Sequence, residues 1–156
     1  MAPRAPLHRP APAVHAASHT ASAKSAPSGR YTEATGRRKT AIARVRITVG
    51  NGKVVVNGKD LKSYFTLPRL MAAAIAPLEQ LKLSENYDVS VHVSGGGINA
   101  QAEAIRHGLS RAIVIVTPDW KPRLRAMGYM TRDSRMVERK KYGLKKARRA
   151  PQWAKR

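Results

Sequence analysis

The residues most able to do chemistry in this chain are cations, concentrated between Lys121 and Arg156. A guanidinium can donate two parallel hydrogen bonds to one phosphate, whereas an ammonium acts as a point charge. Only two acidic residues, Asp133 and Glu138, lie in this stretch. Such an excess indicates a dense polyanion as the partner. The stretch contains fourteen Lys or Arg residues: Lys121, Arg123, Arg125, Arg132, Arg135, Arg139, Lys140, Lys141, Lys145, Lys146, Arg148, Arg149, Lys155 and Arg156.

The same stretch has little apolar surface. Beyond Gly128 the large apolar residues are too scattered to line one face of a long helix. Such a segment cannot offset the entropy that it would lose on ordering. We therefore expect residues 121–156 to be disordered when alone, apart from a short helix ending at Gly128. Residues 129–156 are expected to form an extended basic tail.

Length and composition limit the class of protein. The 156 residues allow one ordinary domain with appendages, and the net charge of +21 favours RNA, DNA or an anionic membrane as partner. No window approaches the ~18 apolar residues of a membrane span, and there is no signal-peptide core. Without cysteine, disulfides and thiolate metal sites are excluded.

Catalysis finds little support in the residue types. The nine acidic residues are scattered, the five histidines match no usual metal motif, and no nucleophile–base arrangement follows from the spacing. We therefore expect a protein that is not an enzyme and has no cofactor and no metal. An RNA-processing enzyme would need clustered carboxylates for Mg²⁺, and a histone-like DNA compactor would share the charge alone.

Residues 1–30 form a low-complexity lead of Ala, Pro, Ser and His without an acidic residue. The prolines disfavour a long helix there, so a disordered extension is expected. An organelle transit peptide is the alternative, because such segments are also Ser- and Arg-bearing and acid-poor. The sequence leaves both readings open.

Alternation of apolar and polar residues predicts the first strands. From Ala41 to Val49 the odd positions are apolar and the even ones are polar except Ile42, which predicts a strand with a basic outer face. A second strand over Lys53–Val56 is predicted to form a hairpin with it. A short helix through Phe65, capped by Asp60, and a helical stretch from Arg69 to Ile75, disturbed at Pro77, are expected next.

The second half follows the same logic. Tyr87–Val93 alternates as a strand, the three glycines 95–97 interrupt it, and helical spacing then continues from Ile98 to Val116. Pro118 should end that helix, and Asp119 could cap the short helix before Gly128. The fold class is therefore α+β: residues 31–128 form a sheet of three or four strands with helices packed on one face.

Two glycine-containing motifs could bind phosphate. Gly95, Gly97 and Ala100 satisfy a relaxed dinucleotide fingerprint, but no acidic residue ends a second parallel strand at the required distance. A structural turn is favoured there, with a backbone contact to nucleic-acid phosphate left open. Residues 36–40 end in Lys-Thr as a Walker A loop does, but lack the glycine before the lysine. We interpret them as a basic loop for RNA phosphate, although a solvated turn is the alternative.

Three separated motifs resemble the bacterial-type family of small-subunit ribosomal protein nine. They are Thr35–Val45, then Gly95–Gly97 with Gln101-Ala102 and Ala104–Gly108, and finally Gly143–Gln152 with Lys155-Arg156. The resemblance covers residues 31–156. The chain departs from the family pattern at Ala100 and Glu103, where small residues are expected, and at Trp153-Ala154.

The resemblance implies a domain on the head of the small subunit, bound to small-subunit rRNA and to neighbouring ribosomal proteins, with no membrane. It implies a tail whose terminal Lys155 and Arg156 approach the peptidyl-site tRNA. A cytoplasmic ribosome is expected, and an organellar one also fits. The expected rRNA-binding residues are Arg37, Arg38, Lys39, Arg44, Arg46, Arg106, Arg111, Arg123, Arg125, Arg132, Arg135, Arg139, Lys140, Lys141, Lys145, Lys146, Arg148 and Arg149.

Overall fold

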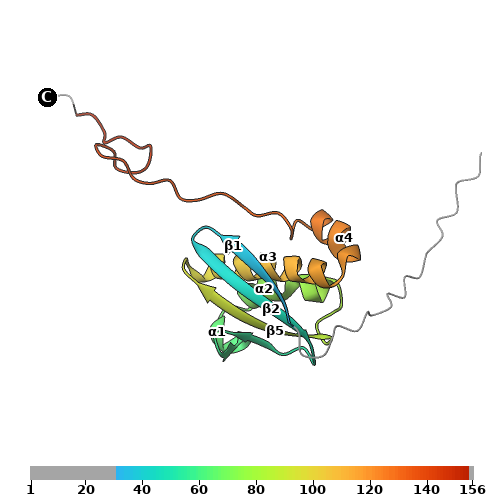
Figure 1. The fold of residues 1–156 in the computed structure, drawn as a ribbon. Helices are drawn as coiled ribbons and strands as arrows, with labels where there is room; N and C mark the ends of the chain where they lie inside the picture. The colour runs from blue at the N-terminus through green and yellow to red at the C-terminus, as the bar shows by residue number, and fades with distance from the viewer. Residues whose placement is uncertain (1–30, 155–156) are drawn as a thin grey trace, which may run out of the picture.

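A single sheet carries the helices on one of its faces (Figure 1). The computed structural model describes residues 31–154, and the strand order is β1-β2-β5-β3-β4. The mixed α+β class is confirmed, but the sheet has five strands rather than three or four. The elements are β1 (Thr32–Arg38), β2 (Ala41–Val49), β3 (Val54–Val56), β4 (Lys59–Asp60), α1 (Leu61–Tyr64), α2 (Pro68–Gln80), β5 (Tyr87–Ser94), α3 (Ile98–Val116), η1 (Pro118–Trp120) and α4 (Lys121–Ala126).

The hairpin of the fold joins β1 to β2, a pairing that the sequence did not suggest. The two strands are antiparallel, and Lys39 takes a left-handed φ of 51° in the turn between them. Arg37 and Arg38 therefore lie on a strand, so the expected basic loop over 36–40 is reduced to Lys39 and Thr40. The sequence does not predict β1, because its inward residues, Ala34 and Gly36, are too small to give an apolar alternation.

The predicted hairpin between Ala41–Val49 and Lys53–Val56 is wrong. β5 lies between β2 and β3, antiparallel to the first and parallel to the second. Its inward valines, Val89, Val91 and Val93, are each no more than 4 % exposed. A strand with such an apolar face is best buried at the centre, and the three-residue β3 pairs with its far edge. The predicted turn at Asn57-Gly58 instead joins β3 to β4, with positive φ at both residues.

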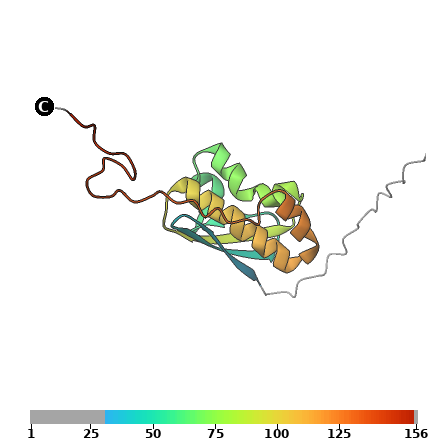
Figure 2. The same ribbon diagram turned by 90° about the horizontal axis from the view of Figure 1, so that it is seen from above.

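The predicted strands β2 and β5 and helix α3 are confirmed. On β2 the inward odd positions from Ala41 to Ile47 are buried, whereas Val49 at its end is exposed. α3 buries Ile105, Leu109 and Ile113 against the sheet, and α2 packs beside α3 on the same side (Figure 2). The core therefore lies between the inner face of the sheet and these two helices.

Two helix predictions need correction. α2 continues through Pro77 to Gln80, although a proline removes one backbone hydrogen bond. Pro77 and the neighbouring Leu78 are buried, so packing keeps the helix intact. Asp60 does precede α1, but neither it nor Asp119 makes a side-chain capping hydrogen bond.

The first residues of the basic stretch are folded, as the predicted short helix before Gly128 requires. Lys121–Ala126 form α4, and Leu124 is fully buried. The helix ends as predicted at Gly128, which has a φ of 75°. The amide of Gly128 donates to the carbonyl of Arg125, and that of Tyr129 donates to the carbonyl of Leu124, which is a Schellman motif.

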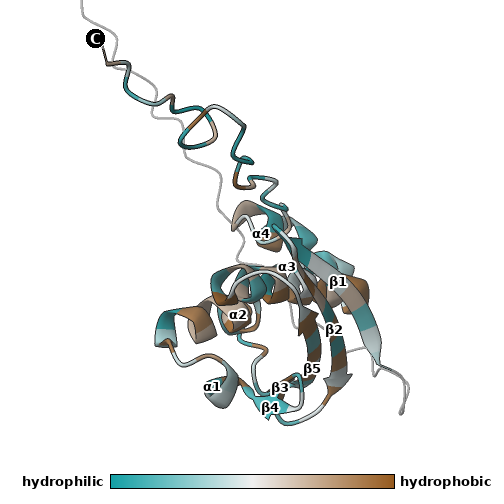
Figure 3. Ribbon diagram, turned by 90° about the vertical axis from the view of Figure 1, so that its left-hand side faces the viewer, coloured by the Kyte–Doolittle hydropathy of each residue, from teal (hydrophilic) through white to brown (hydrophobic). Residues whose placement is uncertain are grey.

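After α4 the described chain contains no further helix or strand up to residue 154. This segment passes over α3 and then leaves the domain (Figure 1), and it is mostly hydrophilic (Figure 3). The expected N-terminal extension and its transit-peptide alternative lie outside the described residues, as do Lys155 and Arg156. None of the helices in residues 31–154 is long and apolar enough to cross a bilayer.

Sheet and helix approach each other closely where Gly36 on β1 faces Gly108 on α3. A Cβ on Gly36 would lie 1.9 Å from the carbonyl oxygen of Ala104 and 2.3 Å from the amide nitrogen of Gly108. On Gly108 it would lie 2.8 Å from a methyl carbon of Val45. The two glycines let α3 lie directly on β1, and this contact places the arginines of both elements side by side.

Candidate nucleic-acid interface

The open face of the sheet carries two arginines held by one carboxylate. Arg44 and Arg46 project from β2, and Glu33 on β1 lies opposite Arg46. The Nε atom of Arg46 donates to Glu33 at 2.8 Å, and the Nε atom of Arg44 lies 3.7 Å from the same carboxylate. The guanidinium of Arg46 also stacks 4.5 Å from the ring of Tyr31. The hydrogen bond that Arg46 donates to Glu33 raises the pKa of Arg46 above its ordinary value.

These arginines border a hollow of about 270 Å³ on the open face. Its rim is fixed by Asn57, whose amide nitrogen donates to the carbonyl of Val93 and whose oxygen accepts from the amide of Val93, both at 2.9 Å. The hollow is polar and cationic, and an anionic group could enter it from solvent. The residues that line it are Arg44, Arg46, Asn57, Gly58, Ser90, Val91 and His92.

A second group of cations lies where β1, α3 and the segment after α4 meet. Only 12 % of the Arg38 side chain is exposed, and its guanidinium pairs with Glu103 and with Asp133. Arg111 on α3 donates to the carbonyl of Thr35 on β1. Arg106 lies 5.5 Å from the ring of Tyr129. Cations from distant parts of the sequence therefore share one surface.

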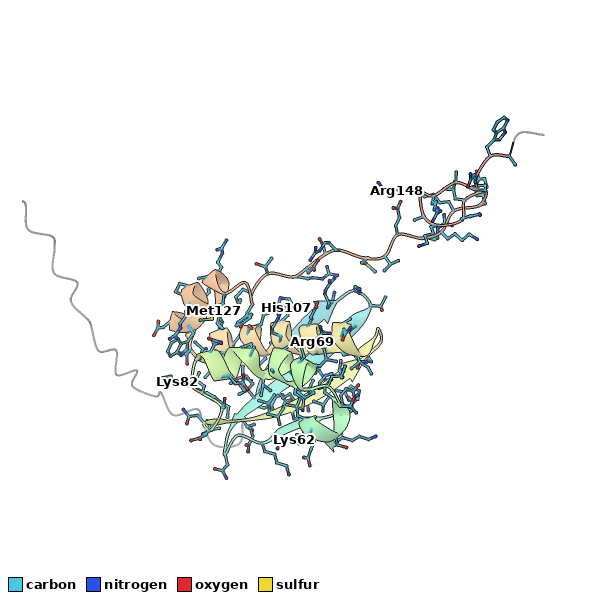
Figure 4. The ribbon with its side chains drawn as sticks, turned by 180° about the vertical axis from the view of Figure 1, so that it is seen from behind. Lys62, Arg69, Lys82, His107, Met127 and Arg148 are labelled. Carbon is cyan, nitrogen blue, oxygen red and sulfur yellow. The ribbon has the colours of Figure 1, made fainter. Side chains whose placement is uncertain are left out.

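His107 lies at the centre of this second group, on α3 beneath the segment that follows α4 (Figure 4). Its Nδ1 atom accepts a long hydrogen bond, 3.4 Å, from the amide of Arg37. Burial lowers the pKa of His107 below its ordinary value, and the nearby charge of Arg111 lowers it further. The imidazole is therefore neutral at neutral pH, and it can stand among arginines without adding to their repulsion.

Replacing Arg111 with glutamine is expected to raise the pKa of His107 towards 6.5, but only in part, because burial is the larger cause. In the unaltered chain the unfolded state binds the proton more readily than the folded state. The free energy of unfolding should therefore fall as the pH drops below 6.5. An NMR titration of the imidazole protons and urea unfolding at several pH values would measure both effects.

A matched variant, His107→Asn, keeps an acceptor for the amide of Arg37 and removes the titrating group. It should unfold with a weaker dependence on pH in the same range. A pKa of His107 at or above 6.5 in the folded chain would contradict the assignment.

The remaining predicted residues of the domain lie apart from these two groups. Arg123 on α4 stacks 5.6 Å from the ring of Trp120 and donates to the carbonyl of Gln80 at 3.2 Å. Arg125 on the same helix is exposed, as is Lys39 in the β1–β2 turn. The structure thus distributes the predicted site over several surfaces of the domain.

In the segment after α4, Glu138 closes a loop of cations. Its two carboxylate oxygens pair with Lys141 at 3.0 Å and with Arg148 at 2.8 Å, and the amide of Lys145 donates to the carbonyl of Arg149 at 2.8 Å. This loop lies far from the domain (Figure 4). Its other cations are exposed and make no ion pair within residues 31–154: Arg139, Lys140, Lys145, Lys146 and Arg149.

The glycine turn before α3 has a structural explanation. Gly95 and Gly96 have φ values of 72° and 65°, and a Cβ on Gly95 would lie 2.6 Å from the carbonyl oxygen of Thr40. Gln101 donates to the carbonyl of Gly95 at 3.1 Å and ties the turn to the helix. The favoured interpretation as a tight turn therefore fits the geometry, and a phosphate contact at this turn stays a prediction.

Sequence reasoning missed the carboxylates that organise the cations. Glu33, Glu103 and Asp133 each hold at least one arginine, and no local pattern indicates these pairs. In the sequence, Glu103 stands out only as a departure from the family motif. Among the described residues, no group of three or more His, Asp or Glu could hold a metal ion.

Together, the small α+β domain and its surfaces of exposed guanidinium and ammonium groups define a basic protein of the nucleic-acid-binding type. A model of the family described as Ribosomal protein S9/S16 matches residues 36–156. The match covers most of the chain, and the chain belongs to the ribosomal protein S9/S16 family. It is therefore a structural ribosomal protein, with rRNA and other ribosomal proteins as its partners and the ribosome as its location.

Proposed function

We propose that the domain docks on the head of the small subunit and binds its rRNA, and that the residues after α4 form a basic tail reaching the peptidyl-site tRNA. Neighbouring proteins of the head would complete the contacts. The observation that carries this proposal is the number of exposed cations without a carboxylate partner on the domain and along the segment after α4. Phosphate contacts of this kind supply affinity and register rather than sequence selectivity.

The predicted rRNA-binding residues divide by their partners. Several are already held by acidic side chains: Arg38, Arg44, Arg46, Arg135, Lys141 and Arg148. The others make no ion pair within residues 31–154 and are the stronger candidates for phosphate: Arg37, Lys39, Arg106, Arg111, Arg123, Arg125, Arg132, Arg139, Lys140, Lys145, Lys146 and Arg149. Glu33 still leaves Arg44 half-exposed, so the hollow on the open face stays available to an anion.

The tip of the tail carries the tRNA part of the proposal. An extended chain covers at most about 3.3–3.6 Å per residue, so residues 136–156 could span roughly 70 Å. That reach would let Lys155 and Arg156 meet phosphates well away from the domain. Arg156 is the better candidate for a positioned contact, because a guanidinium can donate two hydrogen bonds to one phosphate.

Small subunits reconstituted without this protein, and then supplied with variants of it, test both parts. The full chain and a chain ending at Ala154 should be incorporated equally, because the rRNA contacts lie elsewhere. The shortened chain should weaken tRNA binding at the peptidyl site by about tenfold, the loss of one charged hydrogen bond. Filter binding of tRNA to the isolated subunits measures it.

The matched control removes two cations from the opposite edge of the domain, with Lys59→Ala and Lys62→Ala, both exposed. This variant should bind tRNA normally. Equal tRNA affinity of the shortened chain and the full chain would remove the tRNA role, and failure of the full chain to enter the subunit would remove the docking on rRNA.

A further inference from the structure

Arg38 joins three segments that are distant in sequence. It projects from β1, and its guanidinium contacts Glu103 on α3 and lies 2.8 Å from Asp133 after α4. A third group, the carbonyl of Arg135, accepts a hydrogen bond from Nη1 of Arg38 at 2.7 Å. The N–H donors of the Arg38 guanidinium therefore bind groups within the protein.

The residues that Arg38 holds are already shaped among themselves. Asp133 accepts from the amide of Arg135 at 2.9 Å and pairs with its guanidinium, which closes a tight turn. Upstream, the Schellman motif fixes Tyr129, and Arg106 stacks on its ring. Residues 129–135, the tail root, are thus attached to the domain at both of their ends.

We propose that Arg38 is a positioning residue, which fastens the tail root to β1 and α3 and so fixes the direction in which the tail leaves the domain. The role of Arg38 deepens the proposed function. It rests on that function only for the part that the tail plays in binding RNA. An isolated surface ion pair contributes little, typically about 0–1 kcal/mol. Arg38 differs because its side chain is 12 % exposed and bridges two carboxylates.

Loss of Arg38 would leave those two carboxylates facing each other. Glu103 and Asp133 both contact the same guanidinium, so without it the like charges would repel. The tail root would then separate from α3. The attachment also places Arg132 in one small crevice with Arg37, Arg106 and His107. The carboxylates of Glu103 and Asp133 line the same crevice.

The absence of cysteine allows a direct test on the free full chain. Spin labels at Thr48→Cys on β2 and Met136→Cys just beyond the tail root would report their separation by pulsed electron resonance. The unaltered background should give one narrow distance peak. Arg38→Gln and Asp133→Ala should each lose that peak and give a broad distribution.

One further variant and one further measurement separate a specific attachment from general charge or stability. Arg37→Gln removes an equal charge from the next position of β1 and should keep the narrow peak. Asp133→Ala lies outside the strands and helices, so circular dichroism should show an intact fold while the peak is lost. A broad peak in the background chain, or a narrow one in Asp133→Ala, would overturn the proposal. Because no RNA is present, the result is independent of whether the protein binds rRNA.

Discussion

Replacing Gly36 with alanine is expected to lower the free energy of unfolding by about 3 kcal/mol or more, the upper part of the range for overpacked sites. The added Cβ would lie 1.9 Å from the carbonyl oxygen of Ala104 and 2.3 Å from the amide nitrogen of Gly108. Both are backbone atoms, so no side-chain rotation can relieve the clash. β1 or α3 must therefore move. That movement would disturb buried residues such as Val45 and Ile105, which pack between sheet and helix.

Urea unfolding followed by circular dichroism would measure this loss, and the thermal midpoint should fall by roughly 12 °C or more for a domain of this size. Gly97→Ala is the matched control, since a Cβ there meets nothing within 4 Å and its φ of −94° suits any residue. It should cost less than about 1 kcal/mol, the usual effect of alanine at an N-cap. Equal stability of the two variants would show that the β1–α3 contact is not close.

The close contact at Gly36 explains why a glycine stands in this basic motif. A glycine next to two arginines and a Lys-Thr pair suggests a phosphate-binding loop. In the structure the glycine serves packing, because it admits α3 against β1, and the arginines beside it project to the two faces of a strand. The same short stretch of β1 therefore holds a glycine required for packing and arginines predicted to bind RNA.

The parts of the fold that the sequence predicts are those whose side chains alternate strongly. β2, β5 and α3 each bury a row of apolar residues, and all three were predicted. β1 was missed because its inward positions are Ala34 and Gly36, which leave no periodic signal. The predicted pairing of β2 with β3 was wrong. Strand order depends on which strand must be buried at the centre of the sheet, and adjacency along the chain does not reveal that order.

The candidate site was predictable in its charge but not in its pairing. The cations can be counted from the sequence, whereas the carboxylates that hold Arg38 lie 65 and 95 positions away along the chain and come together only in the fold. Glu103 illustrates the limit. As a departure from a motif it had no assigned role, and in the structure it is one of the groups that hold Arg38.

The residues beyond the tail root form a dense run of cations available to RNA. Nine cations follow Arg135, opposed only by Glu138, which pairs with Lys141 and Arg148. No carboxylate in the described segment opposes the others, and almost no apolar surface supports a fold of their own. Their contribution to binding should therefore be electrostatic and additive, and it should appear in the dependence of affinity on salt.

A chain ending at Arg135 is expected to bind small-subunit rRNA with a salt slope lower by about 5, since each neutralised phosphate contributes about 0.7–0.9. Between 50 and 200 mM salt the full chain should therefore lose about a thousandfold more affinity than the shortened chain. Filter binding across that range measures both slopes. A full-length chain with residues 136–156 in scrambled order is the control, because it keeps the charge and loses any fixed arrangement; it should keep the steep slope. If the shortened chain keeps that slope too, the domain alone neutralises the phosphates, and the tail cannot be the main site of rRNA binding.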